Sequence, residues 1–168
     1  MHADAAAAPG PVGVVVGVHV NPEGGVPKHA VGLALVTTTG VAGDRQRDLK
    51  HHGGPDRAVC LFALERIEAL AAEGHPIAPG TAGENLTVAG LDWSRLGPGD
   101  RLAVGDDVVL EITGPAPPCN TIAGSFTGGE FKRISAKLHP GWSRLYARVL
   151  REGVVRERAA VCLLGQAL

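Results

Sequence analysis

The sequence has few aromatic residues, no closely spaced cysteine pair and no long apolar run. Phenylalanine, tryptophan and tyrosine together make up 4% of its 168 residues. No stretch approaches the roughly 18 consecutive apolar residues of a membrane-spanning helix, so no membrane insertion is expected. Cys60, Cys119 and Cys162 form no CxxC pair, which argues against a structural zinc site. An odd cysteine count without a secretion signal predicts a cytoplasmic protein.

The chain also lacks a strong charge of either sign. Its formal net charge is −1 with histidine neutral, which argues against a nucleic-acid partner held by a broad basic surface. A local basic pocket for a small phosphorylated ligand remains compatible with that balance. Neither a Walker loop nor a dinucleotide-binding fingerprint occurs, so a nucleotide-binding fold is not indicated.

Glycine, proline and valine-rich segments are abundant instead. The 24 glycines and 12 prolines predict many turns, and β-branched residues favour pleated strands. We expect a mainly β protein with a few short helices (α+β), whose strongly bent, mixed sheet is barrel-like. Residues 1–11 are interpreted as a disordered N-terminal tail, and residues 12–168 as a single domain.

Turn residues divide the chain into short elements. Pro115, Pro117 and Pro118 lack a backbone donor, so the sheet should end there or run along an edge. Helical spacing after the third strand and the stop at Gly74 predict one clear helix, at 64–73. We predict a short helix or turn at 91–96 and a short helix at 130–138. The predicted strands are 12–20, 31–38, 58–62, 84–88, 101–104, 108–112, 146–150 and 160–164.

The segment from Gly43 to Val59 carries the densest charge in the chain. It holds four cations, three carboxylates and the pair His51-His52, so it must lie at the surface. The histidines could bind zinc, donate to an anion, or form a solvated surface pair. The cations of this region suit a phosphate, although a solvated charged loop is the alternative. They are Arg45, Arg47, Lys50 and Arg57, and Lys28, which precedes the segment, is grouped with them.

Cys119 follows two prolines that fix the backbone before it. A thiol held in this way could be a nucleophile, a soft metal ligand, or simply a small buried apolar residue. Cys60 and Cys162 lie among apolar neighbours and are interpreted as core residues. Asn85, at the start of a predicted strand, could bond both backbone and ligand.

Taken in order, several short segments resemble the MOSC domain family, named for the C-terminal domain of molybdenum cofactor sulfurase. The likeness covers nearly the whole chain after about residue 12 and is closest to small free-standing bacterial members. The segments that carry it are Gly25-Val26-Pro27-Lys28, Gly43-Asp44-Arg45, His52-Gly53-Gly54 with Arg57-Ala58-Val59, Gly83-Glu84-Asn85-Leu86, Gly99-Asp100, Pro118-Cys119, and Trp142 through Leu150.

The resemblance implies a site for molybdenum cofactor, a pterin dithiolene that carries a phosphate. It implies that Cys119 is the protein ligand to molybdenum, and that Lys28 and Arg45 contact the phosphate or pterin. Asn85 would help to seat the cofactor, with Arg57, His51 and His52 near the site. It gives no reason to expect pyridoxal phosphate.

Two departures from the family pattern bear on the site. Many relatives carry arginine just before the Pro-Cys pair, where this chain has Pro117, so one cation for the cofactor is missing there. Ser143-Arg144-Leu145 stands like an insertion in the closing segment.

Two functions remain open from the sequence. The first is a molybdenum-dependent reductase of N-hydroxylated compounds, such as N-hydroxylated purine bases. Its electrons would come from a separate reductase protein, because the chain has no flavin or iron–sulfur motif. The second is a carrier of persulfide sulfur or of the cofactor, without turnover of a small molecule. Either protein is expected as a monomer or a homodimer.

Overall fold

The computed structural model describes residues 12–45 and 54–166. The predicted tail, His51, His52, Arg47 and Lys50 lie outside these residues.

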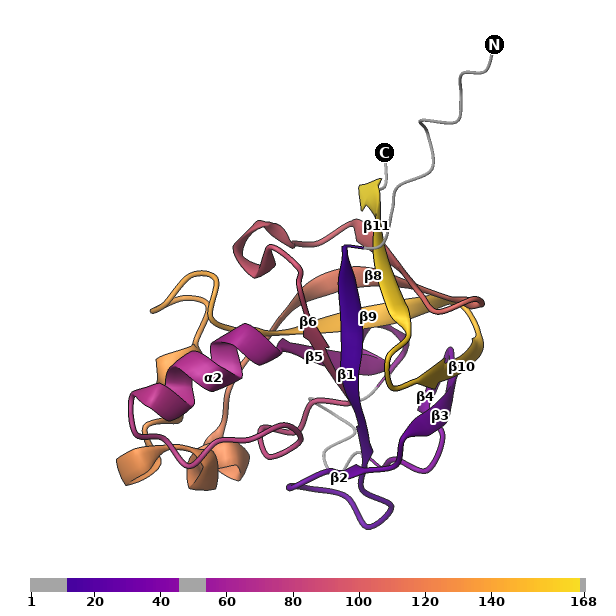
Figure 1. The fold of residues 1–168 in the computed structure, drawn as a ribbon. Coiled ribbons are helices and arrows are strands. Elements are labelled where there is room, and N and C mark those ends of the chain that lie inside the picture. The colour runs from indigo at the N-terminus through magenta and orange to yellow at the C-terminus, as the bar shows by residue number, and fades with distance from the viewer. Residues whose placement is uncertain (1–11, 46–53, 167–168) are drawn as a thin grey trace.

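Seven strands form a closed barrel (Figure 1). They are β1 (Gly13–Val20), β5 (Val59–Ala63), β6 (Leu86–Ala89), β7 (Asp100–Val104), β8 (Val108–Ala116), β9 (Arg144–Arg151) and β11 (Ala160–Gln166). The hydrogen-bonded order is β11-β7-β8-β9-β5-β6-β1, and β1 pairs with β11 to close the ring. Only β5 and β6 are parallel among these pairs, so the sheet is mixed. The predicted mainly β, barrel-like fold is confirmed.

The remaining elements lie around the barrel. Helix α2 (Leu64–Ala72) belongs to the crossover that the parallel β5–β6 pair requires. β2 (His29–Ala30) pairs with β1, and a second sheet has the order β10-β3-β4. Its strands are β3 (Leu33–Thr37), β4 (Gly40–Val41) and β10 (Gly153–Arg156). The 3₁₀ helices are η2 (Pro55–Arg57), η3 (Trp93–Arg95), η4 (Asn120–Ser125), η5 (Thr127–Gly129) and η6 (Phe131–Ile134).

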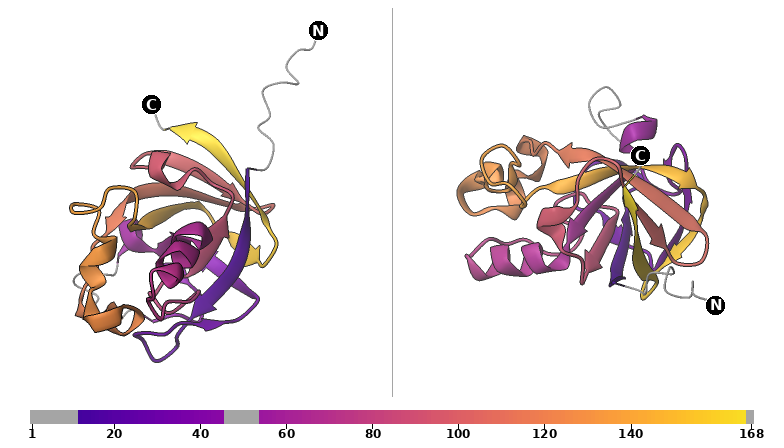
Figure 2. Two further views of the ribbon diagram at one scale, coloured as in Figure 1. Left: turned by 60° about the vertical axis from the view of Figure 1, so that its left-hand side comes forward. Right: turned by 90° about the horizontal axis from the view of Figure 1, so that it is seen from above.

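The core fills the barrel with aliphatic side chains from nearly every strand. Because successive strand residues point to opposite faces, each ring strand can send alternate residues inward. Helix α2 adds Ile67 and Leu70 from one face. Figure 2 shows α2 and the 3₁₀ helices of residues 120–134 on the same side of the barrel. The largest fully buried apolar side chains are Phe62, Leu61, Leu70, Leu86, Leu102, Leu110, Ile112 and Ile134.

Strand β8 runs further than its prolines suggest. It continues through Pro115 to Ala116, paired with β9, whereas its pairing with β7 stops at Glu111. This last stretch is therefore an edge on one side, where the missing N–H of Pro115 breaks no ladder bond, as predicted.

Three local predictions were wrong. Arg144 and Leu145 are not an insertion, because they open β9 and pair with Ala116 and Pro115. Only residues Phe131–Ile134 of the predicted segment 130–138 are helical, as one 3₁₀ turn. Strand β10 was missed. It has only four residues, its Val154 is exposed rather than part of the core, and its partner β3 is distant in sequence.

Candidate functional site

One end of the barrel contains a cavity of about 320 Å³, here called the thiol cavity. Six separate chain segments converge on it, namely the loop after β1, the segment after β4, the strand β5, the loop before β6, the segment after β8, and the start of β9. Its lining residues are Gly24, Gly25, Val26, Lys28, Arg45, Cys60, Ala82, Gly83, Cys119, Thr121, Ile122, Arg144 and Tyr146. The cavity thus joins two cysteines and three cations that are distant in sequence.

Cys119 enters the thiol cavity from the end of β8. Its backbone is extended, with φ −141° and ψ 175°, and its carbonyl oxygen accepts a hydrogen bond from the Ile122 amide at the start of η4. The residue is a free cysteine and only partly buried. The thiol is therefore fixed by its backbone and accessible, which excludes the interpretation as a packed core residue.

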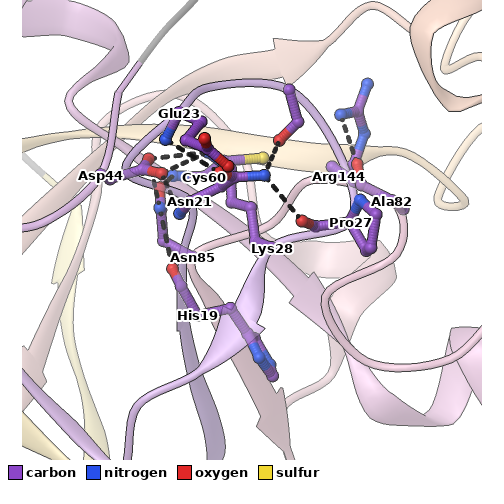
Figure 3. Close-up of polar contacts among 11 residues, drawn as sticks. His19, Asn21, Glu23, Pro27, Lys28, Asp44, Cys60, Ala82, Asn85 and Arg144 are labelled. Carbon is purple, nitrogen blue, oxygen red and sulfur yellow. Dashed lines mark hydrogen bonds and ion pairs between the residues drawn. The ribbon is translucent and has the colours of Figure 1, made fainter.

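Lys28 is also a cavity residue, but its charge is already paired. Its Nζ lies 2.7 Å from both carboxylate oxygens of Asp44, and both side chains are more than nine-tenths buried. Asp44 accepts two further hydrogen bonds, from the backbone N–H of Asn21 at 2.8 Å and from Nδ2 of Asn85 at 2.9 Å. Figure 3 shows this cluster beside Cys60. The ammonium group is held rigidly, with most of its charge neutralised.

Asn85 lies behind the cavity wall rather than in it. The residue is fully buried, and its Oδ1 accepts a hydrogen bond from the Cys60 amide at 3.0 Å. Its Nδ2 donates to the His19 carbonyl oxygen and to Asp44. These three bonds engage both ends of the side-chain amide, so any contribution of Asn85 to ligand binding acts through Asp44 and β5.

Arg144 is a cavity residue that the sequence did not reveal as part of a site. The residue is 5% exposed, and its guanidinium donates to the carbonyl oxygen of Ala82 at 2.9 Å (Figure 3) and to that of Pro117 at 3.2 Å. Its Nε is buried without a partner, and no carboxylate of the described residues forms an ion pair with it. The cation that seemed missing at position 117 reaches the same segment from β9. The only sequence signal was an arginine directly before an apolar strand.

Glu84 is a buried carboxyl that directly follows the cavity residue Gly83. It is fully buried, and its Oε2 accepts hydrogen bonds from the Gly80 amide and the Thr87 hydroxyl, each at 2.9 Å. Burial raises the pKa of Glu84, against the opposing influence of these bonds and of Arg144. Among the described residues no ion pair joins Glu84 to Arg144.

The two remaining predicted cations differ in position. Arg45 lines the thiol cavity and also a neighbouring hollow near η2. Arg57 lines only that second hollow, where its guanidinium carbon lies 5.4 Å from the ring centroid of Tyr146. Tyr146 itself lines the thiol cavity. Arg57 therefore lies next to a cavity residue without lining the cavity.

The described residues offer few ligands for a metal ion. They contain no group of three or more His, Cys, Asp or Glu side chains arranged to hold one. Within the described residues, a metal beside Cys119 would therefore find no further cluster of protein donors. Backbone could approach a bound ligand closely at Gly83, whose φ is +85° and where an added Cβ would lie 3.2 Å from Val26 and 3.8 Å from Arg144.

The second cavity thiol, Cys60, is chemically unlike the first. It is 4% exposed, and burial raises its pKa to about 11. Burial likewise raises the pKa of Tyr146 to about 12, so both groups stay protonated at neutral pH. The prediction that Cys162 is a core residue was wrong, because it is only partly buried.

We expect iodoacetamide at pH 8 to modify Cys119 and to spare Cys60 in the folded protein, because alkylation requires an accessible thiolate. Peptide mass spectrometry after brief labelling measures both sites. The same reaction in guanidinium chloride, where all three cysteines should react, is the control. Equal modification of Cys60 and Cys119 in the folded protein would contradict this difference.

No helix in residues 12–45 or 54–166 is long and apolar enough to cross a membrane.

Comparison with known proteins gives one family. The model of the MOSC domain matches residues 48–161. YflK of Bacillus subtilis is 37% identical over 128 residues, which are 74% of this chain and 55% of YflK. YiiM of Escherichia coli is 35% identical over 119 residues, or 65% of this chain and 52% of YiiM. The chain thus spans about half the length of these relatives.

A third relative and one solved structure extend the comparison. A Gibberella moniliformis protein named "Reductase" is 30% identical over 138 residues, which cover 79% of this chain and 24% of that protein. The crystal structure of Escherichia coli YiiM superposes with a TM-score of 0.66 at 26% identity, over 91% of this chain and 71% of that one.

Proposed function

The chain belongs to the MOSC domain family, and from that premise we propose that its thiol cavity binds molybdenum cofactor and that the protein reduces N-hydroxylated compounds, such as N-hydroxylated purine bases. One observation carries the proposal. An accessible thiol and a buried guanidinium, which pairs with no carboxylate in residues 12–45 or 54–166, face the same cavity. The first suits a soft metal and the second suits an anion.

The residues of the cavity fit such a cofactor. Cys119 would supply the single protein sulfur to molybdenum, because Cys60 is buried and stays protonated. Arg144 and Arg45 would hold the phosphate or pterin oxygens. Lys28 already gives two hydrogen bonds to Asp44, so only its third donor remains for the ligand. Asn85 is a positioning residue, because it fixes Asp44 and does not face the cavity.

The bound cofactor would supply the two-electron chemistry and the position for the substrate oxygen. In the overall balance, an N-hydroxyl group takes two electrons and two protons and yields an N–H group and water. Tyr146 stays protonated at neutral pH, so its hydroxyl at the cavity wall can donate a hydrogen bond. The electrons would come from a separate reductase protein. The Gibberella relative, of which this chain matches only about a quarter, is named a reductase, which agrees with a reductive reaction.

A carrier function is the second candidate, and the accessibility of Cys119 favours it equally. A free, partly exposed thiol can hold sulfane sulfur as a persulfide without any metal. In that case Arg144 and Arg45 would bind an anionic donor or acceptor of the sulfur.

Composition of the purified protein tests the proposal. After expression in a host that makes the cofactor, we expect molybdenum and oxidised pterin in equal molar amounts, together with reduction of an N-hydroxylated purine by dithionite-reduced viologen. A control expression in a cofactor-deficient host should give protein without metal or activity.

Two results would contradict the proposed reductase function. Metal-free protein with a mass increase of about 32 Da on Cys119 would establish the persulfide carrier in its place. Metal-free, unmodified and inactive protein from the competent host would exclude both functions.

A further inference from the structure

A second groove lies behind the wall of the thiol cavity. It has a volume of about 520 Å³ and is here called the proline groove. Pro115, Pro117 and Pro118 form one side, and the residues around and after η6 form the other. We infer that this groove is the docking surface for the electron donor, an acidic protein that carries its own redox centre. The inference rests on the proposed reductase function.

The groove and the thiol cavity share a wall that is one chain thick. Pro118 lines the groove, and the next residue, Cys119, lines the cavity. Likewise, Ser143 lines the groove, and the next residue, Arg144, lines the thiol cavity. Arg144 binds the Pro117 carbonyl oxygen from the cavity side, which ties the two segments together. A redox centre seated in the groove would therefore face the cofactor across very little protein, and electron transfer slows steeply with distance.

The segment from η6 through β9 is rich in positive charge although the whole chain is nearly neutral, and two of its cations, Lys132 and Lys137, line the groove. Residues 131–151 contain six lysines and arginines and no Asp or Glu. Arg133 is paired with Glu73, and Arg148 with Asp56 and Glu111.

Lys132 and Lys137 line the groove, are exposed, and form no ion pair with any carboxylate of the described residues. Two unpaired cations at the rim would attract and orient an acidic partner.

The remaining groove surface is apolar and stiff. Leu138 is 57% exposed, the largest exposed fraction among the apolar side chains of the described residues, and Phe131 lies partly buried beside it. The prolines lose little conformational freedom on binding because their backbone is already fixed. An apolar floor with a basic rim matches a small, transient interface of the kind that electron-transfer proteins form.

Charge reversal at the rim tests the inference. We expect Lys132→Glu/Lys137→Glu to raise the KM for a reduced plant-type [2Fe–2S] ferredoxin, used as the acidic probe, by about tenfold or more. Turnover with dithionite-reduced methyl viologen should equal that of the parent, because a small donor needs no docking. The parent should lose ferredoxin-dependent activity as salt rises, and the variant should lose this dependence.

Arg156→Glu/Arg158→Glu is the matched control. It changes the net charge equally at two exposed positions around β10, on the other side of the barrel from η6 (Figure 1). It should behave as the parent with both donors. Equal effects of the two double variants, or no effect of either, would overturn the docking surface.

Binding separates this inference from the proposed function. If viologen supports no turnover in the parent, the reductase function fails, and titration of ferredoxin against each protein still decides the surface. Salt-sensitive binding that Lys132→Glu/Lys137→Glu weakens about tenfold supports it. Binding unchanged in that variant, or binding of the parent to anionic lipid vesicles and not to ferredoxin, overturns it.

Discussion

Asp44→Ala is expected to lower the free energy of unfolding by about 3–5 kcal/mol, the usual cost of removing one partner of a buried ion pair. The variant leaves the Lys28 ammonium buried without its carboxylate. It also removes the acceptor for the backbone N–H of Asn21 and for one hydrogen bond from Nδ2 of Asn85. Urea unfolding followed by circular dichroism measures the change.

Two companion variants show whether the buried pair is the cause. Glu23→Ala removes an exposed carboxylate from the loop after β1, which also carries Lys28, and should change stability by no more than about 0.5 kcal/mol. Lys28→Met/Asp44→Leu removes both charges and should recover part of the loss, although the Asn21 and Asn85 donors stay without an acceptor. A loss below about 1 kcal/mol in Asp44→Ala would show that the pair does not hold this end of the barrel.

Cys119→Ser is expected to abolish molybdenum retention and to lower reductase activity by about a hundredfold or more, with no change in thermal unfolding of the empty protein. A hydroxyl is a hard donor that does not ionise at neutral pH, so it cannot replace a thiolate at a soft metal. Because Cys119 is only partly buried, the loss of its sulfur leaves no large void. Metal analysis and viologen-linked turnover measure the two effects.

Cys162→Ser is the matched control for the cysteine variant. Cys162 is also partly buried, but it lies on β11 and does not line the thiol cavity. The control should keep both metal and activity. Full activity of Cys119→Ser would remove this sulfur from the mechanism, whereas equal losses in both variants would indicate general damage.

The fold was largely predictable because its signals are local. Valine-rich runs predicted β1 within one residue, and helical spacing with the stop at Gly74 predicted α2 as residues 64–73 against the observed Leu64–Ala72. The two-residue strands β2 and β4 carry too little pattern to be recognised. Closure of the ring depends on the pairing of β1 with β11, which no local pattern encodes.

The site was predictable only where a motif marks it. Lys28, Arg45 and Cys119 were singled out in sequence, and they line one cavity in the structure. Arg144 was missed because its direction follows from the register between β8 and β9, which brings it opposite Ala116. The register of β9 opposite β8 is a property of the whole sheet and not of the residues around position 144.

Arg144 links the strength of the fold to what the cavity holds. An empty cavity keeps a guanidinium out of water with no ion-pair partner in the part of the chain that the structure describes, and that isolation weakens the native state. An anion seated beside it removes the strain and adds stability that grows with the logarithm of its free concentration. A newly made chain would thus be the form most exposed to proteases, and capture of its ligand would also complete its maturation.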